Sequence, residues 1–470
     1  MNDRKVKVAV IGAGTAGLSA FREAFGVNPD CVLINSGPYG TTCARVGCMP
    51  SKVFIQVANN YYHRHVFDRE GIKNSGDLSI DRREVLRYVR SLRDYFVGGV
   101  IKSVEKLGDK NIKGFARFVA PNVLDVEGQK IIADAVVIAT GSSPVIPKPW
   151  REYGEKLITT DDIFEEDTIA DEMAVIGAGV IGLELGQAMS RMDVNVTMVE
   201  GTESIGGLTD PVINRYAIDT IREEFNLYLV HPAELSRNDS QLELSCSGEK
   251  RGIEKALIAI GRRPNIQGLE LEKIGVGLNE KGMPEVDSST MRIKDTPIFM
   301  AGDVNGFRPL LHEAADEGRI AGYNAVRSKT RCFRRRASLA IAFTEPQIAI
   351  AGNRYREIEE VPHIIGEATF DGQGRARIMD KNKGILRIYA EPGGGKLLGA
   401  EMMAPEGEYI GHLLAWAIQK ELTVFEVLNM PFYHPTVLEG LRTAVRDLSS
   451  KVEGPRPELE LPPCGKCPVE

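Results

Sequence analysis

Two stretches of this sequence decide its fold: VKVAVIGAGTAG at residues 6–17 and MAVIGAGVIG at residues 173–182. Each is an apolar strand followed by GxGxxG and then by residues that favour a helix, a pattern typical of a turn that cradles a pyrophosphate. The intervals from Gly12 to Asn35 and from Gly177 to Glu200 are both 23 residues long, and each ends a second apolar strand. A single such motif is weak evidence, but two with matched spacing predict two dinucleotide-binding units.

The glycines of these motifs have separate physical roles. The first permits a tight turn, the second lets the backbone approach a pyrophosphate, and the third lets the helix pack on the strand. The amide groups at the helix N-terminus then face the phosphates. The candidate cofactor-binding glycines are Gly12, Gly14, Gly17, Gly177, Gly179 and Gly182.

Further apolar strands that end on glycine complete the two units. They are ADAVVIATG at 133–141, ALIAIG at 256–261 and IFMAGD at 298–303. Because the last of these follows the second unit, one nucleotide-binding domain is expected to be interrupted by the other. From residue 343 onward the sequence becomes β-rich around a helix near residues 408–420, and five prolines beyond Ser450 predict an extended tail.

The composition is that of an ordinary soluble protein, with 470 residues, 43% hydrophobic residues and a net charge of −7. This length provides for about three domains with cores of their own. The acidic balance argues against a nucleic-acid partner, and the sequence shows neither a secretory signal nor an apolar run of roughly 20 residues. We therefore expect a cytoplasmic protein with no nucleic-acid or membrane partner, in which closely spaced cysteines do redox or metal chemistry.

One cysteine pair, Cys43 and Cys48, stands in GTTCARVGCMPSK, just after the second strand of the first unit. Two thiols five residues apart can close a disulfide across a distorted helical turn, and Pro50 fits a helix that is irregular there. A zinc site would recruit His63 and His65, but this spacing matches no common zinc module. Two inert cysteines are the other alternative. The position beside a dinucleotide site favours a redox disulfide, and we predict no metal site.

At this motif the sequence resembles the flavoprotein disulfide reductases. The pattern from residue 6 to about 447 is similar to dihydrolipoamide dehydrogenase, of the class I pyridine nucleotide-disulfide oxidoreductases, and spans over nine-tenths of the chain. The motifs that carry the resemblance occur in family order: GAGTAG, CARVGCMPSK, VIATGS, GAGVIGLELG, AIGRRPN, AGD, HEAADEG, FTEPQIAIAG and HPTVLEG.

The resemblance implies an α/β fold with two Rossmann-like domains, for FAD and NAD, and an α+β C-terminal dimerisation domain. It also implies a homodimer. It divides the chain into an FAD-binding domain (1–145), an NAD-binding domain (146–270), a central continuation of the FAD-binding domain (271–342), an interface domain (343–450) and a proline-rich tail with CxxC (451–470).

The resemblance also assigns catalytic roles. Cys43 matches the thiol that attacks the substrate disulfide, and Cys48 matches the thiol that lies against the flavin. His434, in YHPTVLEG, matches a histidine that reaches the cysteine pair of the partner subunit, and Glu439 matches the glutamate that orients it. Histidine titrates near neutrality, so it can take a proton from a dithiol and return it.

The remaining implied residues hold cofactors. Lys52 matches a lysine near the flavin that pairs with the glutamate found here as Glu184. The resemblance adds further cofactor contacts at Asn35, Ala116, Thr140, Gly141, Glu200, Gly261, Asp303 and His312.

The nicotinamide preference depends on Glu200. A carboxylate at the end of this strand accepts hydrogen bonds from the adenosine ribose of NAD and repels a 2′-phosphate, and residues 200–204 (EGTES) contain no arginine. Three positions depart from the family pattern. Asn35 replaces the glutamate that usually holds the FAD ribose, Arg45 replaces an asparagine and supplies a cation that favours thiolate, and the tail carries Cys464 and Cys467.

These observations predict an enzyme: an FAD-dependent, NAD-linked oxidoreductase of the dihydrolipoyl dehydrogenase type that oxidises a dihydrolipoyl dithiol reversibly through Cys43 and Cys48. Its partner would be a lipoylated carrier protein or free dihydrolipoamide. The alternative is an NADH-dependent reductase of another disulfide, persulfide, metal ion or protein, with Cys464 and Cys467 as a relay. That tail pair can also be inert or bind adventitious metal. A non-enzymatic assembly component is a further alternative, which the intact cysteine pair and His434 disfavour.

Overall fold

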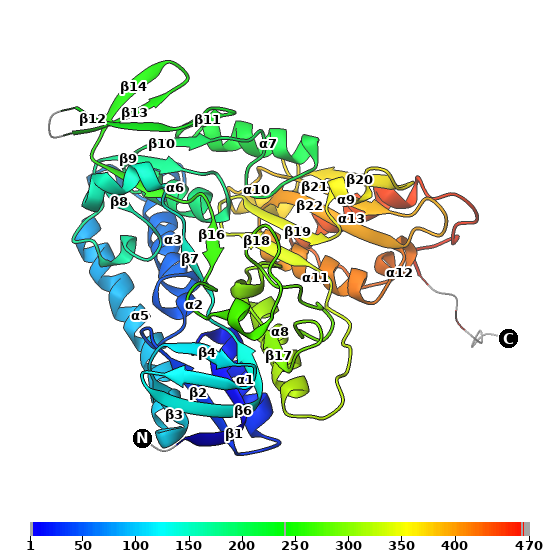
Figure 1. Cartoon of the computed structure of the whole chain (residues 1–470). Coiled ribbons are helices and arrows are strands. Elements are labelled where there is room, and N and C mark those ends of the chain that lie inside the picture. The colour runs from blue at the N-terminus through cyan, green and yellow to red at the C-terminus, as the bar shows by residue number, and fades with distance from the viewer. Residues whose placement is uncertain (1–2, 239–240, 462–463, 465–470) are drawn as a thin grey trace.

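The computed structural model describes residues 3–238, 241–461 and 464 of the chain. Figure 1 shows three bodies of secondary structure. The N-terminal sheet and its helices lie at the bottom, the inserted sheet at the upper left, and the C-terminal sheet at the right. The first two bodies carry the two GxGxxG motifs.

The N-terminal sheet has seven strands in the order β3-β2-β1-β6-β5-β4, with β17 paired beside the end of β6. The strands β1, β2, β3, β6 and β17 are parallel, whereas β4 and β5 form an antiparallel meander with β6. The chain therefore completes this sheet only after it has passed through the inserted unit. Its strands are β1 Arg4–Ile11, β2 Cys31–Asn35, β3 Asn111–Lys113, β4 Ala116–Ala120, β5 Val123–Val126, β6 Gln129–Ile138 and β17 Ile298–Met300.

Two helices of this unit, α1 and α8, pack with their backbones in direct contact. A Cβ atom on Gly318 of α8 would lie 2.2 Å from the carbonyl oxygen of Ala16, and one on Gly322 would lie 2.3 Å from that of Ala20. Glycine is therefore required at both positions for α8 to approach the helix of the first GxGxxG. The helices around this sheet are α1 Thr15–Phe25, α2 Thr42–Arg45, α3 Cys48–Tyr62, α4 Arg64–Phe67, α5 Arg82–Glu105 and α8 Leu311–Ala325.

The inserted unit has a parallel sheet in the order β11-β10-β9-β15-β8 and an antiparallel meander β12-β13-β14. A two-stranded ribbon, β7 with β16, joins it to the N-terminal unit, so the chain enters and leaves the insert at one place. The elements are β7 Ser142–Pro144, β8 Leu157–Ile158, β9 Glu172–Ile176, α6 Val180–Arg191, β10 Asn195–Glu200, α7 Pro211–Arg222, β11 Asn226–Leu229, β12 Glu234–Asn238, β13 Gln241–Cys246, β14 Glu249–Ile253, β15 Lys255–Ile258 and β16 Arg262–Pro264.

The C-terminal unit is an antiparallel sheet in the order β18-β19-β22-β21-β20, with helices packed on it. Gly366 of β20 lets α13 approach, since a Cβ atom there would lie 2.3 Å from the carbonyl oxygen of Ala444. The elements are β18 Leu339–Ala342, β19 Gln347–Gly352, α9 Tyr355–Ile358, β20 Ile364–Thr369, α10 Gly374–Ile378, β21 Ile385–Ala390, β22 Leu397–Ala404, α11 Gly407–Gln419, α12 Val424–Leu428 and α13 Leu438–Ser449. Short 3₁₀ helices cover Ser75–Asp77, Gly108–Lys110, Lys148–Lys156, Ile163–Glu165, Leu271–Ile274 and Asp303–Asn305.

A buried ionic cluster joins the inserted unit to the C-terminal unit. Arg191 of α6 is 5% exposed. Its Nη2 atom lies 2.8 Å from Glu224 Oε1 and its Nη1 atom lies 3.3 Å from Glu345 Oε2, and Nη1 also donates to Asn59 Oδ1 of α3 at 2.7 Å. A single guanidinium thereby contacts all three units and fixes their relative orientation.

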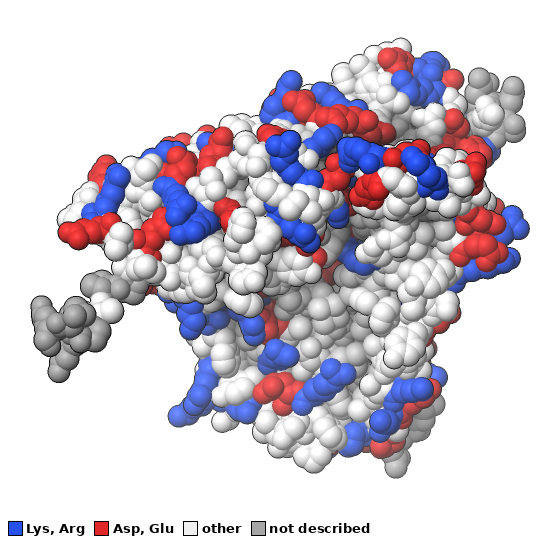
Figure 2. All heavy atoms as spheres, turned by 180° about the vertical axis from the view of Figure 1, so that it is seen from behind, with Lys and Arg blue, Asp and Glu red and all other residues white. Residues whose placement is uncertain are grey.

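The predicted fold class, α/β with two Rossmann-like units and an α+β C-terminal domain, is confirmed by this architecture. The bounds of the five predicted segments stay predictions. Within the described ranges, no helix is both long and apolar enough to cross a membrane. Figure 2 shows basic and acidic side chains interspersed over the face of the molecule seen from behind.

Candidate functional site

The two cysteines of the CARVGC motif lie on either side of a break between two helices. Cys43 is in the short helix α2, and Cys48 is the first residue of α3. The break is at Gly47, where a Cβ atom would lie 3.2 Å from Cys43 Cα and 3.1 Å from the carbonyl oxygen of Thr42. Gly47 therefore allows the chain to fold back tightly enough for the two thiols to meet, as a distorted helical turn requires.

The two thiols interact and differ strongly in acidity. Cys43 hydrogen-bonds to Cys48, which is exposed, and this bond, aided by the charge of Lys52, lowers the pKa of Cys48 to about 7. The same hydrogen bond, together with burial, raises the pKa of Cys43. The N-terminus of α3 also favours a thiolate at Cys48. In the dithiol form Cys48 therefore carries the negative charge and Cys43 keeps its proton.

The cation that favours the thiolate of Cys48 is Lys52, whereas the sequence predicted this role for Arg45. Lys52 is the principal cation that acts on Cys48, and Arg45 is not among the main contributors to its pKa. Arg45 instead has a buried Nε atom that finds no hydrogen-bond partner among the described residues.

Lys52 is held by residues from two other units. Its Nζ atom donates to Glu184 Oε2 at 2.6 Å and lies 4.7 Å from the centre of the Phe343 ring. Glu184 is 4% exposed, and its other oxygen accepts the backbone N–H of Phe343 at 2.8 Å. The pairing of Lys52 with Glu184 that the resemblance implies is thus present, and the C-terminal unit completes it.

The first glycine motif forms a cradle that fits the pyrophosphate of FAD. A Cβ atom on Gly12 would lie 2.3 Å from the carbonyl oxygen of Ala139, and one on Gly17 would lie 1.9 Å from that of Gly12. A Cβ atom on Gly14, by contrast, would meet nothing within 4 Å. No side chain caps the N-terminus of α1, so its first amide groups remain available to phosphate oxygens.

The second glycine motif repeats this geometry and fits the pyrophosphate of NAD. A Cβ atom on Gly177 would lie 2.5 Å from the carbonyl oxygen of Ala259, and one on Gly182 would lie 1.9 Å from that of Gly177. Gly179 has open space around it, and no side chain caps α6. The internal repeat of the sequence is therefore also a repeat of local structure.

Asn35 and Glu200 occupy equivalent places at the ends of β2 and β10. Asn35 Oδ1 accepts the N–H of Ala13 at 3.1 Å, and Glu200 Oε2 accepts the N–H of Ala178 at 2.8 Å. The amide nitrogen of Asn35 donates to the carbonyl oxygen of Gly37 at 2.6 Å. Each side chain is thereby fixed against the second residue of its own GxGxxG, at the edge of the cradle.

The ribbon between the two units organises several further predicted residues. Thr140 Oγ1 donates to the carbonyl oxygen of Asn265 at 2.6 Å, and Asp303 Oδ2 accepts from Ser142 Oγ at 2.7 Å. Arg262 Nε donates to Ser142 Oγ at 2.9 Å. Sequence reasoning did not single out Ser142, Asn265 or Arg262, although two of them lie in the AIGRRPN motif.

The other predicted cofactor residues lie in separate places. Gly141 and Gly261 adopt positive φ angles of +71° and +106° beside the ribbon strands. Ala116 begins β4 and is 2% exposed, whereas His312 is exposed in the first turn of α8.

His434 and Glu439 form a hydrogen-bonded pair, with 3.0 Å between His434 Nδ1 and Glu439 Oε1. This bond lowers the pKa of Glu439. The imidazole side chain is 79% exposed. Figure 1 shows α13, which carries Glu439, well away from α2 and the cysteine pair. One chain therefore does not bring the histidine and the thiols together, as expected of a centre shared between two subunits.

Large apolar side chains are exposed on the C-terminal unit. Tyr433, next to His434 in the sequence, is 81% exposed and Trp416 is 65% exposed, and Tyr409 and Met430 are also exposed. They lie on α11 and in the segment between α12 and His434. Exposed apolar side chains of this size are typical of an interaction surface.

The tail begins with the buried Val452 and a backbone contact of Glu453 with Pro392, and further along it is anchored by Glu460. The carboxylate of Glu460 lies 2.6 Å from Arg442 Nη2 and 2.6 Å from Arg446 Nε on α13, and these contacts lower the pKa of Glu460 to about 2. Cys464 is exposed, and Cys467 lies outside the described residues. The sequence predicted an extended tail but gave no sign of this anchor.

The three cysteines outside the two pairs differ in burial. Cys31 and Cys246 are buried, and burial raises the pKa of Cys31 to about 11, whereas Cys332 is exposed. Among the residues that the structure describes, no three histidine, cysteine or acidic side chains are arranged to hold a metal ion.

Two family models match the chain. The model for pyridine nucleotide-disulphide oxidoreductases matches residues 6–318, and the model for the dimerisation domain of these proteins matches residues 339–445.

Among proteins of known activity, a dihydrolipoyl dehydrogenase from Bacillus subtilis is 30% identical, over 93% of this chain and 97% of its own. A mercuric reductase from Acidithiobacillus ferrooxidans is 28% identical, over 96% of this chain and 84% of its own.

Solved structures show the same fold. LpdA from Mycobacterium tuberculosis has a TM-score of 0.83 and 25% identity, and the match covers 94% of this chain and 100% of LpdA. The flavoprotein disulfide reductase RclA from Escherichia coli, as its Cu(II) complex, has a TM-score of 0.83 and 20% identity, over 95% of this chain and 99% of RclA.

Proposed function

The chain belongs to the pyridine nucleotide-disulphide oxidoreductase family, and from this premise we propose that it oxidises a dihydrolipoyl dithiol to the disulfide, reversibly, with NAD⁺ as the final acceptor. The cofactors of the family are FAD and NAD, and the two glycine cradles fit them. The observation that carries the proposal is the geometry of Cys43 and Cys48, which lie on either side of the helix break at Gly47, with Lys52 and its partner Glu184 beside them.

The chemistry of the chain itself is thiol–disulfide exchange. With Cys43 and Cys48 oxidised to a disulfide, a substrate thiolate attacks Cys43 Sγ, the S–S bond breaks and Cys48 leaves as the thiolate. The second substrate thiol then attacks the mixed disulfide, which releases the substrate as a disulfide and Cys43 as a thiol. The low pKa of Cys48 makes it the better leaving group in the first step. When bound, FAD supplies the acceptor that links the resulting dithiol to NAD⁺.

The proton of the substrate dithiol needs a base. His434 of the partner subunit would accept it, with Glu439 fixing the tautomer through the 3.0 Å hydrogen bond to Nδ1, so that Nε2 faces the thiols. The dimerisation domain supports a homodimer, and the exposed aromatic face around Tyr433 supplies the surface.

The cofactors are assigned to the residues around the two cradles. Gly12, Gly14 and Gly17 would hold the FAD pyrophosphate, with Asn35 at the ribose. Further FAD contacts would come from Lys52, Ala116, Thr140, Gly141, Asp303 and His312.

NAD would bind at the second cradle. Gly177, Gly179 and Gly182 would hold its pyrophosphate, and Glu200 would accept hydrogen bonds from the ribose and exclude a 2′-phosphate. Glu184 and Gly261 would complete the cofactor sites. The physiological substrate would be a lipoylated carrier protein or free dihydrolipoamide, in the cytoplasm.

Anaerobic titration of the purified enzyme with dihydrolipoamide tests the proposal. We expect a long-wavelength absorption band from the Cys48 thiolate beside the flavin, and NAD⁺-dependent turnover that Cys43→Ser abolishes. Cys332→Ser is the matched control, because Cys332 is an exposed cysteine outside the site and should leave turnover unchanged. Wild-type turnover in Cys43→Ser, or an enzyme that reduces glutathione disulfide with NADPH but ignores dihydrolipoamide, would overturn it.

A second candidate function is an NADH-dependent reductase of another disulfide, persulfide, metal ion or protein, in which the tail relays electrons. Two observations favour it. The mercuric reductase relatives match nearly the whole chain, and Glu460 anchors the tail on α13 only four residues before the exposed Cys464. A chain truncated after Ser450 distinguishes the two. Truncation should leave dihydrolipoamide turnover intact under the first function and abolish reduction of bulky or metal substrates under the second.

A further inference from the structure

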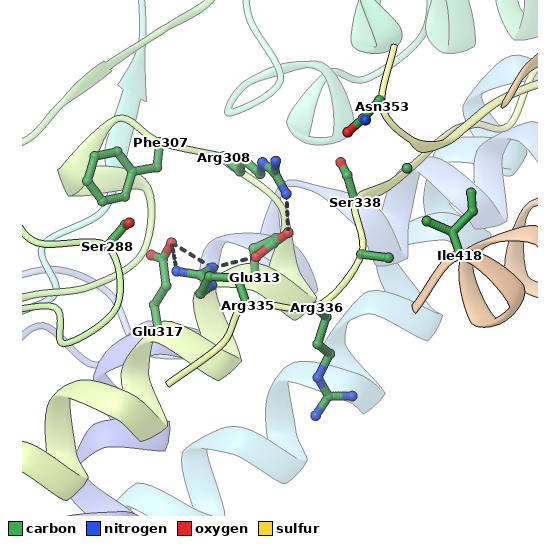
Figure 3. Close-up of a pocket in the computed structure, with 12 residues that line it drawn as sticks. Ser288, Phe307, Arg308, Glu313, Glu317, Arg335, Arg336, Ser338, Asn353 and Ile418 are labelled. Carbon is green, nitrogen blue, oxygen red and sulfur yellow. Dashed lines mark hydrogen bonds and ion pairs between the residues drawn. The ribbon is translucent and has the colours of Figure 1, made fainter. Parts of the chain in front are cut away.

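A charged cluster lies where α8 meets residues 335–338. It lines a cavity of about 420 Å³ between α8, this segment and the C-terminal unit. Arg335 is at its centre and forms ion pairs with both Glu313 and Glu317 of α8, whereas Figure 3 shows Arg336 pointing away from the cluster. Glu313 and Glu317 are both almost completely buried.

Glu317 connects this cluster to a turn on the N-terminal sheet. One carboxylate oxygen accepts both Nη groups of Arg335, each at 3.0 Å. The other accepts the backbone N–H of Gly302 at 2.8 Å and the amide of Asn305 at 2.7 Å. The carboxyl group is 0% exposed, and burial raises the pKa of Glu317. A buried carboxylate stays ionised only when a partner compensates its charge, and Arg335 is that partner.

The turn held by Glu317 contains Asp303, the carboxylate assigned to FAD. Gly302 has a φ of +81°, and a Cβ atom there would lie 2.8 Å from the Cβ atom of Ala16 in α1. On the other side, Asp303 Oδ2 accepts the hydroxyl of Ser142. The turn is therefore fixed by α1, by the ribbon and by Glu317, and the contact with Glu317 depends on the charge of Arg335.

We propose that Arg335 is a positioning residue for the FAD site: by neutralising Glu317 it fixes the turn at Gly302 and so aims the carboxylate of Asp303 at the cofactor. The inference rests on the proposed FAD contact of Asp303. Arg335 belongs to the segment between α8 and β18, the first strand of the C-terminal sheet. Retention of FAD is therefore coupled to the segment that connects the flavin unit to the dimerisation domain.

The rate at which the holoenzyme releases FAD, followed by the fluorescence of free FAD after dilution, tests this role. Arg335→Met removes the charge, and we expect release about tenfold faster, because charge-assisted bidentate contacts are the stronger class of hydrogen bonds. Arg335→Lys keeps the charge but loses the planar fork that serves Glu313 and Glu317 together, so it should fold and still release FAD several-fold faster. The KM for NAD⁺ should not change in either variant.

Arg334→Met is the matched control, because the neighbouring Arg334 is 74% exposed and pairs with Glu421 on the surface. Its FAD release should equal that of the wild type. If both Arg335 variants release FAD at the wild-type rate while their unfolding temperature falls, Arg335 is a structural residue only. Asp303→Asn tests the premise separately. If Asp303→Asn releases FAD at the wild-type rate, the proposed FAD contact of Asp303 is wrong. If Asp303→Asn releases FAD faster but the Arg335 variants do not, the contact stands and the role of Arg335 is wrong.

Discussion

At the scale of single residues, the thiols of Cys43 and Cys48 differ in pKa even without a bound cofactor. The hydrogen bond from Cys43, the charge of Lys52 and the start of α3 all act on Cys48. Lys52 is itself held by Glu184, which the C-terminal unit fixes through the backbone of Phe343. The acidity of one thiol thus depends on contacts made by three separate parts of the chain.

Alkylation of the reduced, FAD-free protein measures this asymmetry. The rate at Cys48 should rise with pH around a midpoint of about 7, against an ordinary value of 9.0, because only the thiolate reacts. Lys52→Met should move the midpoint to higher pH, since it removes a cation and leaves the charge of Glu184 uncompensated. Lys73→Met, an exposed lysine, should not. A wild-type midpoint near 9.0 would contradict the assignment of the thiolate to Cys48.

The pair formed by His434 and Glu439 makes a second prediction at this scale. His434→Gln should lower kcat/KM for dihydrolipoamide by roughly 10²–10⁴, the usual contribution of a general base. Glu439→Gln should lower it less, because the imidazole remains but its tautomer is no longer fixed. His63→Gln, at an exposed histidine at the end of α3, is the control. Equal losses in the His63 and His434 variants would show that neither histidine is the base.

At the scale of elements, the two strand-turn-helix units could be predicted from the sequence because their geometry is local. The GxGxxG spacing determines where the strand ends and where the helix can pack, and Gly17 and Gly182 meet the same carbonyl contact at 1.9 Å. Contacts such as that of Ser142 with Asp303 could not be predicted, because they join residues 161 positions apart. The ion pair of Glu460 with α13 could not be predicted either, because no sequence motif marks it.

The glycines of each motif should respond differently to alanine. Gly14→Ala should leave the stability of the FAD-free chain unchanged but weaken FAD binding, because its Cβ atom enters the open space of the cradle. Gly17→Ala should lower both the stability of the FAD-free chain and its affinity for FAD, since its Cβ atom collides with the backbone of Gly12. Gly179→Ala should raise the KM for NAD⁺ without loss of FAD. Thermal unfolding of the FAD-free chain and titrations with each cofactor check this pattern, and equal effects of Gly14→Ala and Gly17→Ala on stability would refute it.

The tail anchor is also testable as an element. Glu460→Gln should increase hydrogen exchange in residues 455–461, because it removes both ion pairs with α13. Each exposed pair contributes less than about 1 kcal/mol, so the effect should shrink at high salt. Since the pKa of Glu460 is lowered from 4.5 to about 2, the anchor should be complete above pH 4.5 and be lost as the pH falls towards 2. Glu458→Gln is the control, and equal exchange in both variants would exclude Glu460 as the anchor.

At the scale of the whole molecule, the proposed catalytic groups lie far apart within one chain, and we therefore propose that each site is divided between two subunits. His434 is exposed on the C-terminal unit, and the thiols lie at α2 and α3 of the N-terminal unit. The sequence alone could not show this division, which came from the resemblance of HPTVLEG to a family motif. The structure adds an observation that supports the division: His434 is hydrogen-bonded to Glu439 and lies next to the exposed Tyr433 in the sequence.

Complementation between inactive variants tests this division. Cys43→Ser and His434→Gln homodimers should each be nearly inactive. After unfolding and refolding together, half of the dimers are mixed, and each mixed dimer has one site with an intact Cys43 and an intact His434. Activity should therefore recover to about a quarter of the wild-type value. No recovery, in a mixture shown to contain mixed dimers, would place both groups in the same chain.

The β7–β16 ribbon has a consequence for how the inserted unit is joined to the rest of the chain. Because the two strands pair side by side, the first and last residues of the insert are neighbours about 5 Å apart. The inserted unit therefore interrupts the N-terminal sheet between β6 and β17 without separating these two strands, which pair with each other. The ends of the insert meet at the ribbon, and its other contacts, through Glu184 and Arg191, bind it to the rest of the chain.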